Sequence, residues 1–327
     1  MQRAVYGTQG QQQQSFDIPL TPDATPVPYG AVNNKTSLDA APLSADTVKS
    51  HSFNAGLWAS YIGLTLFVYF AFSAGDFSFT MTAGALARMF GLVILNIMMF
   101  GQNSARGISV KTIQCYSVVF LARLSSIVRH DGYLPYDKSG DWIYHMIEIL
   151  SLGLCFVAIY GCQVKFSKSY QADVDIFGAH PPTVPSEYGI VFLVGPMFVL
   201  ALLIHPNLNG DFFSDFAWVF AMYLEAVAII PQLYMFQKDK ASEVELMNAH
   251  YVFALGLGRV LELVFWLFSY HELVSTTGSK APGIVSVLAQ IAQLALMADF
   301  FFYYFVAVKS GDGKMILPSG SFNDGGV

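Results

Sequence analysis

The sequence predicts an all-α polytopic membrane protein, and two observations support that prediction. Hydrophobic residues make up 54% of the 327 residues and charged residues only 12%, whereas an ordinary soluble domain carries about 25% charged residues. Too few charges remain to cover a water-soluble globule of this size, while lipid solvates apolar side chains directly. The second observation is a series of apolar stretches, each close to the ~20 residues that cross the hydrocarbon core as a helix.

Eight such stretches follow one another along the chain. They cover residues 57–74, 82–101, 110–128, 143–162, 189–205, 212–236, 249–270 and 283–308. For the first of them, a re-entrant or interfacial segment is the alternative. We therefore expect seven or eight transmembrane helices.

The N-terminal segment has a different composition from the rest of the chain. It contains a run of glutamines at 11–14, a part rich in proline and threonine, and few large aliphatic residues. Such a segment buries too little apolar surface to offset the entropy lost on ordering. We expect a disordered cytosolic tail over 1–55, followed by a first transmembrane helix over 56–75.

The distribution of lysine and arginine predicts the orientation of the spans, because cytosolic segments are enriched in both. With the N-terminal tail in the cytosol and eight spans, the cytosolic segments hold Arg3, Lys35, Lys49, Arg106, Lys111, Lys165, Lys168, Lys238, Lys240, Lys309 and Lys314. The opposite side holds only Arg129, Lys138 and Lys280. Both termini are therefore expected in the cytosol.

Composition and spacing argue against several classes of function. The net charge is −6 and no basic run is present, which argues against nucleic-acid binding. Cys115, Cys155 and Cys162 lie singly in apolar stretches, which suits neither a zinc site nor a disulfide framework. No nucleophile elbow or glycine-rich phosphate loop appears. We expect neither an enzyme nor a bound metal or cofactor.

Charged residues inside the apolar stretches indicate a functional site. The basic ones are Arg88, Arg123 and Arg259, and the acidic ones, within or at the edge of a span, are Glu148, Asp215, Glu225, Glu262 and Asp299. A charge at membrane depth costs at least ~2.5–3.5 kcal/mol on insertion scales, so such residues pair with one another or line a polar cavity. For any single residue, an ion pair that only fixes the helices is the alternative.

A Pro-Gln pair lies near the end of the span that contains Glu225. Pro231 and Gln232 stand in the stretch YLEAVAIIPQLYM, where proline kinks or ends the helix. The pair resembles the motif of PQ-loop and SWEET-like membrane proteins. The whole stretch resembles the fifth helix of the KDEL receptors, the family that retains proteins in the ER lumen.

Three further segments resemble the same family in the same order, at residues 107–123, 250–266 and 299–304. The resemblance runs from about residue 82 to 318 and leaves out the tail and the first span. It implies seven helices over 80–310, arranged as two three-helix bundles joined by a linker helix, and a cytosolic tail over 311–327. The first span is then an additional helix, as in the receptor-related branch of the family.

The resemblance also implies a function. Members bind the C-terminal KDEL or HDEL tetrapeptide of escaped ER proteins in a lumen-facing polar cavity, at the mildly acidic pH of the Golgi, and return them to the ER. For this chain it implies a multi-pass protein of the ER and Golgi membranes. Its implied partners are a peptide signal, a COPI-type coat on the cytosolic side and the lipid bilayer.

Single residues take roles from this resemblance. Arg123 matches the arginine that engages the terminal carboxylate of the ligand. Asp215 and Trp218 match the pair that would hold a cationic ligand residue. Deeper in the bundle, Glu225 and Arg259 match a charged pair that couples ligand binding to helix movement.

Four more residues match family positions or requirements. Trp266 matches a tryptophan of the sixth helix, and Asp299 an aspartate that bears on retrograde transport. Lys309 and Lys314 would serve in coat recruitment near the C-terminus. Anchoring by positive charge on the cytosolic side is the alternative for the two lysines.

At several ligand-reading positions the chain departs from the family pattern. Two expected arginines read Met81 and Ser269, and the histidine that senses pH reads Arg88, which stays charged at any biological pH. The other departures are Leu124, Ser126, Gly258 and Glu262. Each lost charge-assisted contact costs roughly 1.5–3 kcal/mol, unless Arg88, as a ligand-binding residue, or Arg129 compensates. A variant signal or a different ligand is therefore a further hypothesis.

Two other functions stay open at this point. PQ-loop and SWEET-like proteins transport small solutes, and Arg123, Glu225, Arg259 and Glu262 would suit a solute or proton path. The third hypothesis is a structural membrane protein without a ligand. We interpret His250 as a histidine that packs between helices.

Overall fold

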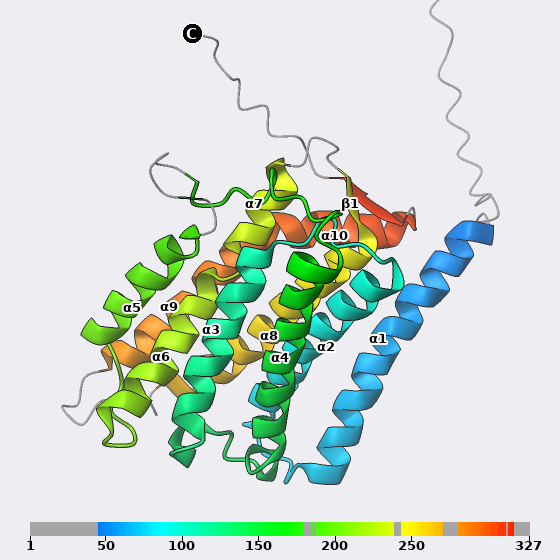
Figure 1. Cartoon of the computed structure of the whole chain (residues 1–327). Coiled ribbons are helices and arrows are strands. Elements are labelled where there is room, and N and C mark those ends of the chain that lie inside the picture. The colour runs from blue at the N-terminus through cyan, green and yellow to red at the C-terminus, as the bar shows by residue number, and fades with distance from the viewer. Residues whose placement is uncertain are drawn as a thin grey trace, which may run out of the picture. The chain divides into compact units, whose positions relative to one another are not determined.

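The protein is described by a computed structural model that covers residues 45–179, 185, 188–238, 243–270, 280–311 and 313–316. Every stretch predicted as a span is helical (Figure 1). Among these residues, five helices are long and apolar enough to cross a membrane, or six if a bent pair counts as one span. The predicted class of an all-α polytopic membrane protein is thereby confirmed.

Within the described residues, five of the predicted spans are helices long enough to cross a membrane. They are α1 (Ala45–Phe72), α2 (Phe79–Gly101), α4 (Ile143–Tyr160), α6 (Phe212–Val227) with α7 (Ile230–Lys238), and α8 (Leu246–Ser269). The bent pair is α9 (Ala281–Leu296) and α10 (Ala298–Ser310), which meet at 47°. The two remaining predicted spans are α3 (Val110–Ile127) and α5 (Val191–Leu203). With its 13 residues, α5 is about 20 Å long.

The helices form two three-helix groups. In the first group α4 packs between α2 and α3, and in the second α9 packs between α6 and α8. The groups meet mainly along α2–α8 and α3–α6, while α5 packs on α6 (Figure 1). This is the predicted arrangement of two three-helix bundles joined by a linker helix.

Helix α1 packs on the outside of this bundle, against α2 and α10. Its Trp58 donates a hydrogen bond to the Tyr304 hydroxyl at 3.0 Å, and its Tyr61 donates to the Ala83 carbonyl at 3.1 Å. Phe67 and Phe70 are exposed on it, as suits a surface that meets lipid. The helix begins at Ala45, so residues 45–55, assigned to the tail from the sequence, are helical.

Short elements define the two ends of the bundle. At one end, strands β1 (Glu243–Glu245) and β2 (Lys314–Ile316) form an antiparallel pair, and we call this the hairpin end. The predicted C-terminal tail over 311–327 therefore begins with a strand. At the opposite end, which we call the open end, the connections from α1 to α2 and from α3 to α4 lie together (Figure 1). The second connection contains η1 (Asp131–Tyr133) and η2 (Lys138–Gly140), while a π-turn, η3 (Gly161–Lys165), extends α4.

The Pro-Gln pair organises the hairpin end. Pro231 stands in the first turn of α7, directly after the break from α6, as expected for a residue without a backbone donor. The buried Gln232 side chain accepts hydrogen bonds from the Ser109 N–H at 2.8 Å and the Tyr251 hydroxyl at 2.5 Å. It also donates to the Gly107 carbonyl at 2.9 Å. One amide thus joins α7 to α8 and to the loop before α3.

Glycines allow α2 and α8 to approach closely. A Cβ atom added to Gly258 would lie 2.7 Å from the Gly84 carbonyl oxygen and 3.0 Å from Arg88 Cγ. One added to Gly84 would lie 2.9 Å from the Gly258 carbonyl oxygen. Small residues at helix crossings permit such backbone contact in membranes. The contact places the next turn of α2, with Arg88, against the next turn of α8, with Glu262.

Candidate functional site

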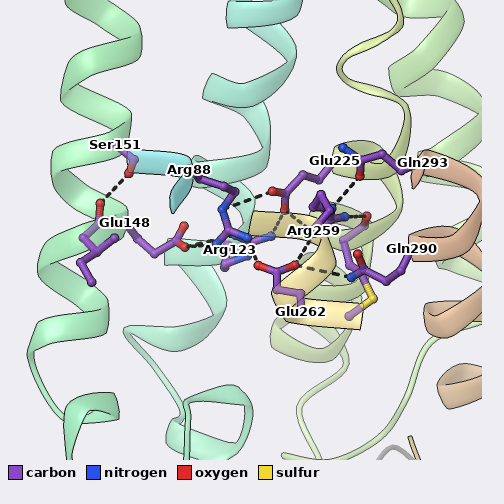
Figure 2. A network of polar contacts seen from close by, with 11 residues as sticks. Arg88, Arg123, Glu148, Ser151, Glu225, Arg259, Glu262, Gln290 and Gln293 are labelled. Atoms are coloured by element: carbon purple, nitrogen blue, oxygen red, sulfur yellow. Dashed lines mark hydrogen bonds and ion pairs between the residues drawn. The ribbon is translucent and has the colours of Figure 1, made fainter. Parts of the chain in front are cut away.

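Six charged side chains meet between the two bundles, and we call them the charge cluster (Figure 2). They are Arg88 of α2, Arg123 of α3, Glu148 of α4, Glu225 of α6, and Arg259 and Glu262 of α8. Three guanidinium groups therefore face three carboxylates, and the formal charge of the cluster is zero. The structure brings together four residues that the sequence singled out, Arg88, Arg123, Glu225 and Arg259.

Arg123 lies between two carboxylates of opposite bundles. Its Nη1 atom is 3.1 Å from Glu148 Oε1, and its Nη2 atom donates to Glu225 Oε2. The side chain is 4% exposed, and the two glutamates are fully buried. The arginine expected to engage a ligand carboxylate is thus already engaged by carboxylates of the chain itself.

Arg88 contacts all three glutamates of the cluster. Its Nη2 atom is 3.0 Å from Glu148 Oε1, its Nε atom is 3.3 Å from Glu225 Oε1, and its Nη1 atom pairs with Glu262. Arg88 therefore joins α2 to α4, α6 and α8. Its guanidinium stays charged at any biological pH.

Arg259 completes the cluster on the side of the second bundle. Its Nη1 atom is 3.2 Å from Glu225 Oε2 and pairs with Glu262 on its own helix. Its Nε atom donates to the Gln293 side chain of α9 at 2.6 Å. Together with Gln290, which donates to Glu262 at 3.5 Å, Gln293 extends the network into α9 (Figure 2).

The ion pairs within the cluster offset the cost of burying six charged side chains inside the membrane. A single buried charge left without its partner costs about 3–5 kcal/mol, and charges inside a bilayer are tolerated when they pair within a bundle. Each arginine here contacts at least two glutamates. The cluster therefore couples the two bundles electrostatically, and removal of any single member leaves a net charge inside it.

A narrow pocket reaches the charge cluster. Its lining comprises Met81, Arg123, Tyr144, Trp218, Met222, Glu262 and Trp266. The volume is about 10 Å³, which is about the space of one water molecule. Trp218 and Trp266 pack edge to face at 5.5 Å. Met81, at a position where an arginine was expected, adds an apolar side chain to this wall.

Asp215 and Trp218 lie together, as the sequence predicted, but a residue of the chain occupies them. Tyr133 of η1 stacks on Trp218 with ring centroids 4.2 Å apart, and its hydroxyl donates to Asp215. Asn209 donates to the same carboxylate oxygen at 3.1 Å. Burial and the bond to Asp215 raise the pKa of Tyr133 well above its usual value, so Tyr133 keeps its proton and remains a donor.

The three residues assigned to trafficking lie at the hairpin end. Asp299 is exposed in the first turn of α10 and lines a small cavity of about 110 Å³ with Gln237 and Tyr303. Lys309 is exposed in the last turn of α10. Lys314 stands on β2 opposite Glu245 of β1. None of the three is near the charge cluster in the fold, so they form a separate region.

Several residues of the site were not among the predicted site residues. Glu148 was noticed only as a charge inside a span, and Glu262 only as such a charge, as a departure from the family pattern and in the hypothesis of a solute path. Tyr133 and Gln293 gave no signal at all. The number of acids inside the spans was the available clue, because three buried arginines require compensation. As interpreted from the sequence, His250 packs between helices, 2.8 Å from the Tyr304 hydroxyl and 2.9 Å from Asn54 Oδ1.

Comparison with known proteins identifies the family. The family model for the ER lumen protein retaining receptor matches residues 104–269, from the loop before α3 to the end of α8. ER lumen protein-retaining receptor 2 of Xenopus laevis is 30% identical over 241 residues, which are 72% of this chain and 97% of the relative. The chain belongs to the ER lumen protein-retaining receptor family.

Other members of the family give the same match. ER lumen protein-retaining receptor 2 of Homo sapiens and the ER lumen protein-retaining receptor of Drosophila melanogaster are each 30% identical over 238 residues, with 72% of this chain and 97% of the relative covered. Almost the whole of each relative is therefore matched, and more than a quarter of this chain lies outside the match. The family resemblance read from the sequence is confirmed.

Proposed function

We propose that this protein is a receptor for C-terminal ER-retention signals, which it binds from the open end and retrieves from the Golgi to the ER. Its membership of the retaining-receptor family supports this proposal. The position of Arg123 carries it. Arg123 lines the narrow pocket together with Trp218, Trp266 and Glu262.

The charge cluster suggests how a ligand carboxylate is received. A free carboxylate that enters the narrow pocket meets Arg123, which now pairs with Glu148 and Glu225. The incoming group exchanges with Glu148, because the Glu148 Oε2 atom has no hydrogen-bond partner among the described residues and the side chain faces both Arg88 and Arg123. Arg88 then retains Glu148 as its partner.

The cationic residue of the ligand would bind at a second position in the site. Asp215 and Trp218 would hold it after Tyr133 moves away, since a carboxylate and an aromatic face both attract cations. Glu225 and Arg259 pair within the second bundle, and Glu225 also pairs with Arg123 of the first bundle. Through these contacts Glu225 and Arg259 would transmit the change between the bundles. Trp266 closes the pocket wall beside Trp218.

We further propose that the hairpin end faces the cytosol and the open end the lumen. The bias of lysine and arginine toward the hairpin end supports this orientation. Asp299, Lys309 and Lys314 would then be accessible to a COPI-type coat, and both termini would be cytosolic. The native sequon at Asn34 tests the orientation, because a glycan on Asn34 in cells would contradict it.

The receptor is favoured over the other candidate functions. The relatives named above are retaining receptors, which favours neither a small-solute transporter nor a structural protein without a ligand. Met81 and Ser269 stand where the family resemblance predicts arginines that read the ligand. The proposal therefore includes a retention signal that differs from KDEL and HDEL. A tetrapeptide with fewer carboxylates than one that ends in Asp-Glu-Leu would suit the narrow pocket, whose described lining contains one arginine, Arg123.

Binding of labelled peptides tests the proposed function. The purified full-length protein in nanodiscs is titrated with peptides that end in HDEL or KDEL, at pH 5.5 and 7.2. The same peptides with an amidated C-terminus serve as controls, because they lack the carboxylate that Arg123 would engage. We expect binding that amidation weakens by roughly tenfold or more, since a charge-assisted contact contributes about 1.5–3 kcal/mol. Absence of binding at both pH values would refute a receptor for the HDEL and KDEL signals.

A further inference from the structure

A large cavity opens at the open end, outside the charge cluster. Its volume is about 850 Å³, which is within the range of known ligand pockets. Three segments line it: the loop before α2, the connection from α3 to α4, and the last turns of α8. We call it the acidic vestibule, because Asp76, Asp131 and Asp141 belong to its lining.

The charge of the vestibule has one sign. All three aspartates are exposed to solvent, and none pairs with a cation among the residues that the structure describes. Its described lining includes no lysine, arginine or histidine. A hollow lined by charges of one sign focuses the electrostatic field and concentrates ions of the opposite sign. Its occupant is therefore expected to be cationic.

The walls favour an organic cation over a metal ion. Within the described part of the chain, no group of three or more carboxylate, histidine or cysteine side chains is arranged to hold a metal. The aspartates are instead spread around a cavity whose lining also includes Phe77, Tyr136 and Phe265. Aromatic faces and separated carboxylates suit the ammonium and guanidinium groups of lysine and arginine.

The vestibule is held in shape by one buried carboxylate. Asp137 accepts hydrogen bonds from the Ser73 hydroxyl at 2.7 Å and from the backbone N–H groups of Ala74 and Asp76 at 3.0 and 3.2 Å. It also accepts from the Ser139 N–H at 2.8 Å. These bonds tie two of the lining segments together before any ligand arrives. A preformed site loses less entropy on binding.

The vestibule and the narrow pocket share two helices. Ser78, just before α2, and Ser269 of α8 line the vestibule. Met81 of α2 and Trp266 of α8, each three residues along the chain from one of these serines, line the narrow pocket at Arg123. A peptide that enters with its C-terminus first and reaches Arg123 would leave the residues before its signal in the vestibule.

We propose that the acidic vestibule binds basic side chains that precede the C-terminal signal of a lumenal peptide. This inference rests on the proposed receptor function and adds a specificity to it. The receptor selects cargo by the charge of the residues upstream of the signal as well as by the signal. Peptides with lysine there bind more tightly than peptides with serine, and peptides with glutamate bind most weakly.

The test compares three fluorescent peptides that all end in HDEL and differ only in the preceding residues: Lys-Ser-Lys-Ser, Ser-Ser-Ser-Ser or Glu-Ser-Glu-Ser. Affinities are measured with full-length protein in nanodiscs at low and high salt. We expect the lysine peptide to bind about tenfold more tightly than the glutamate peptide at low salt, because exposed pairs are individually weak. The preference should shrink at high salt, since salt screens exposed charges.

Two variants locate the effect. In the triple variant D76N/D131N/D141N we expect the preference to fall below roughly twofold, while the affinity for the serine peptide stays as in the wild type. The control is D173N, which removes an exposed aspartate in the connection from α4 to α5, outside the vestibule lining. It should keep the full preference.

The outcomes separate this inference from the proposed function. Equal binding of the three peptides by the wild type overturns the vestibule proposal and leaves the receptor intact. A preference that survives in the triple variant also overturns it. Failure of every peptide to bind, with free carboxylate and at either pH, overturns both the vestibule proposal and a receptor for HDEL.

Discussion

Replacement of Glu148 by glutamine tests whether the Glu148 carboxylate compensates the positive charges of Arg88 and Arg123. The Glu148 Oε1 atom lies 3.0 Å from Arg88 Nη2 and 3.1 Å from Arg123 Nη1. In E148Q, three guanidinium groups face two carboxylates, so the cluster carries one excess positive charge. The amide keeps an oxygen acceptor, which means that the variant loses the charge and little volume.

The magnitude follows from these contacts. Each pair, with charge centres about 4 Å apart, contributes roughly 4 kcal/mol at an effective dielectric constant of about 20. The substitution also removes the desolvation cost of burying the Glu148 carboxylate, and this offsets part of that sum. In practice, loss of one partner from a buried ion pair costs about 3–5 kcal/mol. For a protein of this size we expect the melting temperature to fall by roughly 4–8 °C.

Peptide affinity should change in the opposite direction. The freed Arg123 Nη1 atom is available to the ligand carboxylate, so E148Q should bind an HDEL peptide about tenfold or more tightly than the wild type. Melting is followed by tryptophan fluorescence in nanodiscs, and binding by titration with the labelled peptide. The double variant R88M/E148Q restores a neutral cluster and should recover part of the lost stability. The control E245Q removes an exposed carboxylate at the hairpin end.

Two results would refute the reasoning. If E148Q melts at the temperature of the wild type, Glu148 does not compensate the arginines. If it melts lower but binds the free-carboxylate peptide no better, the ligand does not exchange with Glu148 at Arg123.

Three further predictions concern the architecture that holds the site. G258A should lower stability by about 1–3 kcal/mol, because the added methyl group meets the neighbouring helix backbone; G63A, with no atom within 4 Å of the added Cβ, should melt as the wild type does. Q232A should cost at least about 1–3 kcal/mol, because buried donors and acceptors of α7, α8 and the loop before α3 lose their partner; an unchanged melting curve would show that water replaces the amide. D137A should destabilise equally at pH 5.5 and 7.2. Burial raises the pKa of Asp137, but hydrogen bonds from Ser139 and neighbouring groups lower it below its usual value, so its stabilisation is complete above about pH 4 and is lost only as pH falls through the lowered pKa. A destabilisation that differs between the two pH values would contradict this assignment.

The sequence predicted the helices and the buried charges because both follow from local composition. An apolar run of sufficient length has few alternatives in lipid, and Arg88, Arg123 and Arg259 are conspicuous in such runs. The Pro-Gln pair also marked its own helix break, since proline acts on the backbone of its own turn. In these cases the cause lies within a few residues of the effect.

The partners of those charges could not be read in the same way. Which glutamate faces Arg123 depends on how each helix is rotated and how deeply it crosses, and these depend on contacts such as Gly84 against Gly258. Tyr133 lies in a short connection without a periodic pattern, so nothing local indicates that it stacks on Trp218. The vestibule likewise arises from segments that are distant in the chain.

The contact between Gly84 and Gly258 has a mechanical consequence. At this point the two backbones touch, so the bundles cannot move closer, and the ion pairs one turn away resist their separation. The motion that remains is a rotation of one bundle against the other about this contact. A small tilt at the open end, such as a bound peptide would cause, is then converted into a displacement of opposite sense at the hairpin end, where Lys309 and Lys314 lie.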